Sequence, residues 1–132
     1  MEVRGLMTPI SGRVGANETV RLAAYQMAVR NVGVLPVYDG DVRVGLITDR
    51  DIARQCVAKG LDPDSCSVKD CVQENPICIE AEQDIGAALR VMGQEHVRRL
   101  GVVENGQLVG TIEVGDIAMQ ALEVSSLGQG PY

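Results

Sequence analysis

The apolar residues in the first half of the chain change their spacing along its length. After a polar turn at residues 17–19, they recur at three- and four-residue steps. They are Val20, Ala23, Ala24, Met27 and Ala28. This spacing puts them on one face of a helix, and Thr19 or Asn17 is suited to cap its N-terminus. The pattern predicts an amphipathic helix whose end Gly33 follows.

Two apolar runs come next, at residues 34–38 and 42–47, on either side of an Asp-Gly-Asp turn. Short apolar runs that flank such a turn are typical of a β-hairpin. Thr48 then precedes a second predicted helix, from residue 49 to about residue 59, which Gly60 ends.

The second half of the chain repeats this pattern, because a shift of 65 residues aligns the two halves without a gap. Matched pairs include Val3 with Val68, Met27 with Met92, Val37 with Val102, and Asp51 with Asp116. The second copy predicts a helix over residues 85–94 capped by Asp84, a hairpin of residues 99–103 and 107–112, and a helix from about 114 to 122.

The repeat predicts an α/β (α+β) fold of two units, each built as helix, strand, hairpin, strand and helix. Duplicated units usually bury their apolar faces against each other, so we expect packing about a pseudo-two-fold axis. The predicted boundaries are repeat 1 at residues 3–59, a linker at 60–67, repeat 2 at 68–122 and a tail at 123–132. The Gly- and Ser-rich end of the tail, residues 125–132, is expected to be frayed.

The composition narrows the class of function. The 132 residues carry a net charge of −6, and aromatic residues make up only 2%. Nucleic-acid binding relies on clustered Lys and Arg or on stacked aromatic rings, so we expect no nucleic-acid partner. The chain has no apolar run of membrane-spanning length and no signal-peptide pattern at its N-terminus. These features favour a soluble, cytoplasmic protein with no membrane partner.

Four cysteines, Cys56, Cys66, Cys71 and Cys78, fall within 23 residues. No two of them are spaced as C-x-x-C, so the usual zinc-ribbon and thioredoxin motifs are absent. In an intracellular protein such cysteines are by default small packing residues. A redox-active or metal-binding cluster is the alternative interpretation.

An enzyme is the class that the residues favour least. The only histidine, His96, follows the predicted helix of the second copy, where it is best interpreted as a terminal cation or cap. We find no nucleophile–base pair, Walker loop or paired-His metal motif. We therefore predict no catalytic residues and no metal site.

Short motifs in both copies carry a family resemblance. They are residues 6–9, 34–37 and 45–51 in the first copy, and residues 96–102 and 110–116 in the second. This doubled set resembles the CBS-domain family, and the two copies look like a tandem CBS pair, or Bateman module, of the small stand-alone prokaryotic kind. The resemblance covers residues 3 to about 121.

The resemblance implies a regulatory or sensory module, not a catalyst. Members of the family commonly bind adenosine-containing molecules in clefts between the two repeats. We therefore expect a regulatory ligand such as AMP, ADP, ATP, NAD or S-adenosylmethionine, a protein partner in trans, and a homodimer, with no obligatory cofactor. The alternatives are a structural dimerisation module with inactive clefts, and a redox- or metal-responsive protein that uses the cysteines.

The family geometry implies two clefts built at the strand-to-helix junctions. At such a junction we expect free backbone N–H groups to receive a phosphate, and an Asp to accept hydrogen bonds from ribose hydroxyls. Cleft A would combine Thr48 and Asp51 with Val97, Arg98 and Arg99. Cleft B would combine Glu113 and Asp116 with Val32, Gly33 and Val34. The remaining candidate ligand-binding residues are Thr8, Leu46 and Arg50.

The two clefts are expected to differ in charge. Glu113 stands where the family usually has Ser or Thr, and no Arg is expected to face it. Two carboxylates repel a phosphate, so we expect the nucleotide in cleft A. Cleft B would be empty, or would hold a less negative ligand such as S-adenosylmethionine. Strand alternation puts Arg98 and Arg99 on opposite faces, so only one of them would point into a cleft.

Overall fold

The computed structural model describes residues 1–72 and 76–129, with side chains as far as residue 123. The chain folds as a mixed α+β protein of two compact units. We call Ile10–Pro76 the first-repeat body, and Met1–Pro9 together with the chain from Ile77 onward the second-repeat body. The division does not follow the sequence repeats, because the first nine residues pack with the second repeat.

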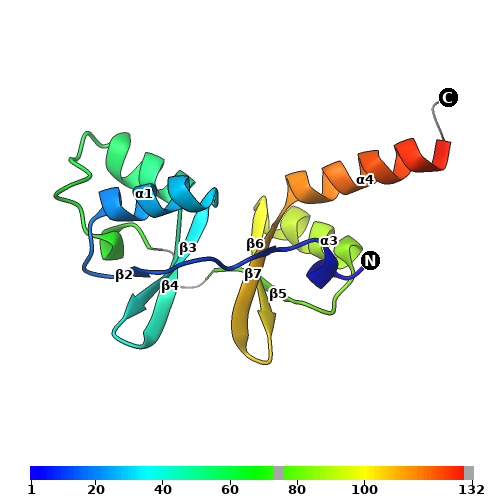
Figure 1. Cartoon of the computed structure of the whole chain (residues 1–132), viewed down its shortest axis with the longest axis horizontal. Helices are drawn as coiled ribbons and strands as arrows, with labels where there is room; N and C mark the ends of the chain where they lie inside the picture. The colour runs from blue at the N-terminus through cyan, green and yellow to red at the C-terminus, as the bar shows by residue number, and fades with distance from the viewer. Residues whose placement is uncertain (73–75, 130–132) are drawn as a thin grey trace. The chain divides into compact units, whose positions relative to one another are not determined.

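The first-repeat body is a three-stranded sheet covered by helices (Figure 1). Its strand order is β2-β3-β4, with β2 parallel to β3 and β3 antiparallel to β4. The strands are β2 (Val14–Gly15), β3 (Val34–Asp39) and β4 (Val42–Thr48). The helices are α1 (Val20–Arg30), α2 (Asp49–Ile52), the π-helix η2 (Ala53–Val57) and the 3-10 helix η3 (Val68–Asp70).

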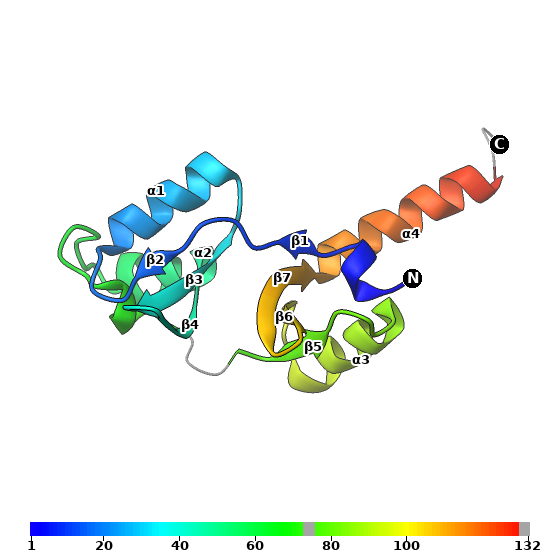
Figure 2. The same cartoon turned by 60° about the horizontal axis from the view of Figure 1, so that its bottom comes forward.

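The second-repeat body is a four-stranded sheet of order β1-β7-β6-β5, with α3 and α4 beside it (Figure 2). The strands are β1 (Thr8–Pro9), β5 (Cys78–Glu80), β6 (Arg99–Glu104) and β7 (Gln107–Glu113). The helices are η1 (Val3–Gly5), α3 (Ile85–Glu95) and α4 (Val114–Gln129). No described helix is both long and apolar enough to cross a membrane.

The predicted repeat is confirmed down to the pairing of single residues. Leu35 pairs with Ile47 in the β3–β4 hairpin, and Leu100 pairs with Ile112 in the β6–β7 hairpin, which is the same pair 65 residues on. The register also shifts at the matching place in each hairpin, after Val37 and after Val102. Such bulges increase the local twist of a hairpin, so both copies bend alike.

The ends of α1 and α3 follow the same rule. The Thr19 side chain caps α1 by accepting a hydrogen bond from Leu22 N at 3.2 Å. The Asp84 side chain caps α3 by accepting a hydrogen bond from Gly86 N at 2.9 Å. Each helix then ends at a left-handed residue, Asn31 or His96, both with φ of 55°. The prediction that His96 serves as a helix cap is confirmed, because the left-handed conformation stops the helix there.

Three details of the predicted helices are wrong. Ala24 and Ala28 are exposed, because α1 buries a narrower stripe of Val20, Ala23 and Met27. The predicted helix over residues 49–59 is α-helical only in α2 and continues as the wider η2 turn. Apolar spacing does not distinguish an α-helix from a π-helix here, because Ile52 in α2 and Cys56 in η2 are both buried.

The third detail is the C-terminal end, where α4 continues to Gln129 instead of ending near Leu122. Residues 125–129 of the expected frayed tail are therefore helical, and residues 130–132 lie outside the described part of the chain. Extending an existing helix needs no new nucleus, so a few Ser and Gly residues do not stop it.

Each repeat contributes its leading segment to the core of the other. Val3 is fully buried in the second-repeat core, and its matched residue Val68 is fully buried in the first-repeat core. The supporting hydrogen bonds also match: Val3 N donates to Gln83 O at 2.7 Å, and Val68 N donates to Glu18 O at 2.9 Å. The exchange is therefore reciprocal.

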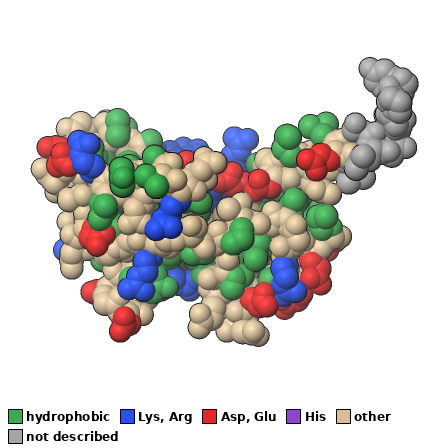
Figure 3. All heavy atoms as spheres, in the orientation of Figure 1, with side chains coloured by type: hydrophobic (Ala, Val, Ile, Leu, Met, Phe, Trp, Pro, Cys, Tyr) green, Lys and Arg blue, Asp and Glu red, His purple; other side chains and the backbone are tan. Residues whose placement is uncertain are grey.

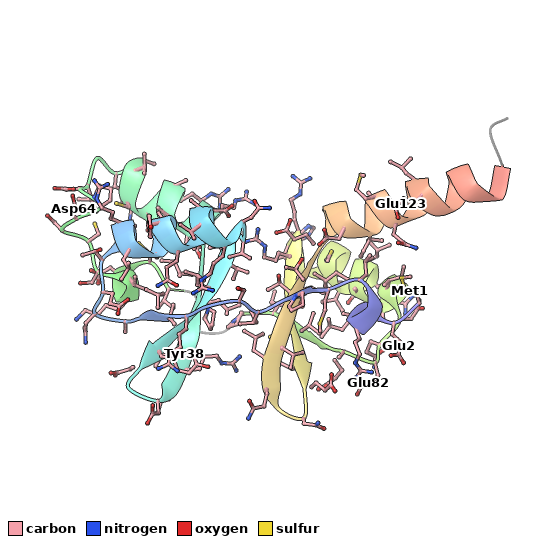
Figure 4. The ribbon with its side chains drawn as sticks, viewed as in Figure 1. Met1, Glu2, Tyr38, Asp64, Glu82 and Glu123 are labelled. Carbon is pink, nitrogen blue, oxygen red and sulfur yellow. The ribbon has the colours of Figure 1, made fainter. Side chains whose placement is uncertain are left out.

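Charged side chains and a short strand hold the exchanged N-terminal segment in place. Arg4 lies within 3.0 Å of Glu104 and within 3.4–3.8 Å of Glu2 and Glu82. Figure 4 shows Glu2 and Glu82 beside η1. Such exposed pairs each stabilise by less than about 1 kcal/mol, so the burial of Val3 and the strand pairing carry most of the attachment.

We predict that Gly110→Ala loosens this segment. A Cβ on Gly110 would lie 2.7 Å from Thr8 O and 2.8 Å from Met7 Sδ, so β1 must move away from β7. We expect the free energy of unfolding to fall by about 1–3 kcal/mol, measured by urea denaturation. Gly93→Ala in α3 is the control, because an added methyl meets nothing within 4 Å there. Equal stability of the two variants would contradict the prediction.

Candidate ligand-binding site

Thr48 and Asp51 form a reciprocal cap where β4 passes into α2. Thr48 Oγ1 accepts a hydrogen bond from Asp51 N at 3.0 Å, and Thr48 N donates to Asp51 Oδ2 at 2.9 Å. The Thr-x-x-Asp spacing produces this cap directly, because the third helical residue can reach back to the cap residue. The arrangement fixes both side chains, with Thr48 buried and Asp51 half-buried.

The expectation of free N–H groups at this junction is wrong for the first turn of α2. Asp49 N donates to Gly33 O at 3.0 Å, Arg50 N donates to Asp49 Oδ1 at 2.8 Å, and Asp51 N donates to Thr48 Oγ1. Within the capping pair itself, the Thr48 hydroxyl hydrogen and Asp51 Oδ1 have no hydrogen bond among the described residues. A hydroxyl donor and a carboxylate acceptor suit a polyhydroxy group such as ribose better than a phosphate.

The second junction has the same backbone but different side chains. Val114 N donates to Arg98 O at 2.9 Å, as Asp49 N does to Gly33 O in the first repeat. Asp116 Oδ2 accepts from Glu113 N at 3.2 Å, which is half of the reciprocal cap. The other half is missing among the described contacts, because the Glu113 carboxylate is turned to a different partner.

That partner is Arg99, which lies directly opposite Glu113 in the β6–β7 pairing. Arg99 Nε donates to Glu113 Oε1 at 2.7 Å, and Arg99 Nη2 bonds to the same oxygen. The expectation that no Arg faces Glu113 is therefore wrong. The sequence repeat could have predicted this pair. Val34 pairs with Thr48 in the first hairpin, and the residues 65 positions later are Arg99 and Glu113.

The other candidate residues are distributed over both bodies. Leu46 is buried in β4, and Arg50 is exposed in the first turn of α2. Thr8 is exposed in β1, where it pairs with Thr111 of β7. Val97 packs against the second-repeat core, while Arg98 is exposed. The structure thus brings together Thr48 with Asp51, and Arg99 with Glu113, while the grouping into clefts A and B stays a prediction.

Three of the four cysteines share the core of the first-repeat body. Cys56 and Cys71 are buried there and Cys66 packs against this core, while Cys78 belongs to β5 of the second-repeat body. Burial raises the pKa of the Cys56 thiol, and hydrogen bonding to Cys66 raises it further. Burial also raises the pKa of the Cys71 thiol. Both thiols are therefore held protonated, which is typical of packing residues and not of reactive thiolates.

Comparison with known proteins finds similarity along nearly the whole chain. The family model described as "CBS domain" matches residues 3–58 and 68–123. The "CBS domain-containing protein YhcV" of Bacillus subtilis is 32% identical over 126 residues, which is 96% of this chain and 89% of that protein.

Two of the solved structures with this fold contain bound groups. The structure of Hypoxic Response Protein I with two coordinated zinc ions is 32% identical in sequence and has a TM-score of 0.71. The match covers 90% of this chain and 98% of the chain in that structure. The structure of CBSX2 in complex with AMP is 24% identical in sequence and has a TM-score of 0.75. The match covers 93% of this chain and 97% of the CBSX2 chain. Among the side chains that the structure describes, up to residue 123 with a gap at residues 73–75, no group of three His, Cys, Asp or Glu residues is placed to hold a metal ion.

The raised thiol pKa values predict a dependence of stability on pH. Unfolding releases Cys56 and Cys71 to their ordinary pKa, so above about pH 8.5 the unfolded state loses protons that the folded state keeps. Stability from these thiols is complete below that pH and is lost as the pH rises through their folded pKa values.

We therefore expect the free energy of unfolding, measured by urea denaturation from pH 7 to pH 10, to fall more steeply in the wild type than in Cys56→Ala/Cys71→Ala. The comparison concerns the slope, because the double variant also loses packing. Identical slopes would show that the two thiols titrate normally.

Proposed function

This chain belongs to the CBS-domain family, and we propose that it binds an adenosine-containing nucleotide at the Thr48–Asp51 junction and signals its occupancy to a partner protein in trans. CBS domains are regulatory modules, and proteins made only of them are generally not catalysts. The AMP complex of CBSX2 supports the proposal at the level of the fold.

The observation that carries the proposal is the state of the Asp51 carboxylate. One oxygen, Oδ2, is fixed by Thr48 N, while Oδ1 has no hydrogen-bond partner within the described residues. A carboxylate that is held in place and left with one acceptor is suited to the hydroxyl donors of a ribose. The Thr48 hydroxyl keeps its own hydrogen to donate to the same ligand.

The ligand class is adenosyl: AMP, ADP, ATP, NAD or S-adenosylmethionine. The residues proposed to complete this site are Leu46, Arg50, Val97, Arg98 and Arg99, with Thr8 as a further contact. The second site, at Glu113, Asp116 and Gly33, is proposed to be empty or to take a less negative ligand. Arg99 cancels the charge of Glu113 there, so Asp116 supplies the remaining negative charge.

We predict that one of these five ligands raises the melting temperature of the wild type and that Asp51→Ala abolishes the effect. A ligand at about 100 times its Kd adds roughly 2.7 kcal/mol to the free energy of unfolding. Asp51→Ala also removes half of the helix cap, at a cost of about 1 kcal/mol, so binding is measured by isothermal titration as well.

Asp49→Ala is the matched control, because it removes an exposed carboxylate from the same turn. We expect it to bind the ligand as the wild type does. If no adenosyl ligand binds the wild type, or if both variants bind equally, the proposed site is wrong.

A second role, dimerisation, is favoured by an apolar stripe on α1. Leu22, Tyr25 and Val29 lie on one face of the helix and are 36%, 65% and 66% exposed. Figure 3 shows apolar side chains gathered on this face of the first-repeat body. We propose that a second copy of the chain covers the stripe, because oligomers of soluble proteins are mostly symmetric dimers that use the same patch twice.

We predict that the wild type has twice its chain mass of 14.1 kDa in light scattering after gel filtration, and that Tyr25→Glu has the mass of one chain. The added charge would be desolvated in the interface, which disfavours association. Ala24→Glu, on an exposed position of α1 outside the stripe, serves as the control and is expected to stay dimeric. A monomeric wild type would exclude this role.

A further inference from the structure

We propose that Glu113 occupies the Arg99 guanidinium in place of a ligand phosphate, so that a phosphate-bearing ligand must displace Glu113 before it binds Arg99. Glu113 would then set the preference of the module among adenosyl ligands. The proposal deepens the proposed function and rests on it for the adenosyl part of the ligand. The competition between carboxylate and phosphate for Arg99 is a separate step with its own readout.

The geometry of the pair supports competition. Two donors of Arg99, Nε and Nη2, converge on the single oxygen Oε1 of Glu113. A guanidinium offers the same fork of donors to a carboxylate and to a phosphate. Because one set of donors serves either partner, the two interactions through Nε and Nη2 exclude each other.

The burial of the pair makes the exchange feasible. The Arg99 side chain is 24% exposed and the Glu113 side chain is 44% exposed. The contact is therefore partly shielded from water, which strengthens it, yet it stays open to a ligand from solution. Glu113 is the more exposed partner, so it can move away while Arg99 keeps its place beside Leu100 in β6.

Comparison of the two repeats shows that the Glu113 side chain does not cap its helix, although the matching residue Thr48 does. Thr48 completes the cap of α2, and its cross-strand neighbour Val34 carries no charge. Glu113 leaves the matching cap of α4 half made and turns to Arg99 instead. Removing the Glu113 charge therefore weakens its contact with Arg99 without removing a side-chain cap from α4.

The test compares AMP with adenosine, which differ only by the phosphate. In isothermal titration we expect Glu113→Gln to bind AMP about threefold to fivefold more tightly than the wild type, as expected from a pair worth up to about 1 kcal/mol. The affinity for adenosine is expected to stay the same. Arg99→Gln should remove the gain when it is combined with Glu113→Gln. Glu104→Gln, which neutralises a carboxylate at the other end of β6, is the matched control and should change neither affinity.

Inorganic phosphate separates this inference from the proposed function. We expect the Arg99 Nε–H resonance, assigned by its loss in Arg99→Gln, to shift at lower phosphate concentrations in Glu113→Gln than in the wild type. If neither AMP nor adenosine binds any variant, the proposed function fails, and the phosphate titration still decides the competition. Equal phosphate responses of wild type and Glu113→Gln would overturn the inference, as would an equal gain for AMP and adenosine.

Discussion

The structure depends on the burial of one valine from each repeat in the core of the other. Val3 and Val68 occupy matched places in the sequence, are fully buried, and are each held by a backbone hydrogen bond to the matching corner. Burying a valine side chain stabilises by roughly 1.5–3 kcal/mol. Neither core is complete without the segment that comes from the other repeat, so the chain passes from one body to the other after Pro9 and again after Pro76.

The same exchange explains why the edge of the second sheet is protected. An exposed edge strand invites pairing with other chains, and β1 covers the outer side of β7. Gly110 permits the close approach, because any larger residue there would meet Thr8 O. The N-terminal segment is thus part of the sheet and not an appendage of the first repeat.

The two strand-to-helix junctions show how a duplicated backbone acquires different chemistry. Both use the same backbone hydrogen bond, from the first helical residue to the residue before the hairpin. In the first junction Thr48 and Asp51 form two reciprocal hydrogen bonds, and Asp51 Oδ1 has no hydrogen-bond partner among the described residues. In the second, Arg99 and Glu113 form an ion pair across the hairpin. Two differences between the copies, Arg99 in place of Val34 and Glu113 in place of Thr48, therefore replace a complete cap by an ion pair beside a half-made cap.

The sequence by itself determined the elements that depend on local chemistry. Apolar spacing, caps and turn residues specified α1, α3 and both hairpins, and the 65-residue match specified that the copies share their strand register. The Thr-x-x-Asp spacing also identified the side chains that meet at the first junction, because a helix cap involves only neighbouring residues. Tertiary structure decided the features that join distant segments. The exchange of Val3 and Val68, the occupied N–H groups of α2 and the Arg99–Glu113 pair all depend on which strand lies beside which. Local propensity does not carry that information, since a matched repeat allows each leading segment to pack on its own copy or on the other with the same sequence.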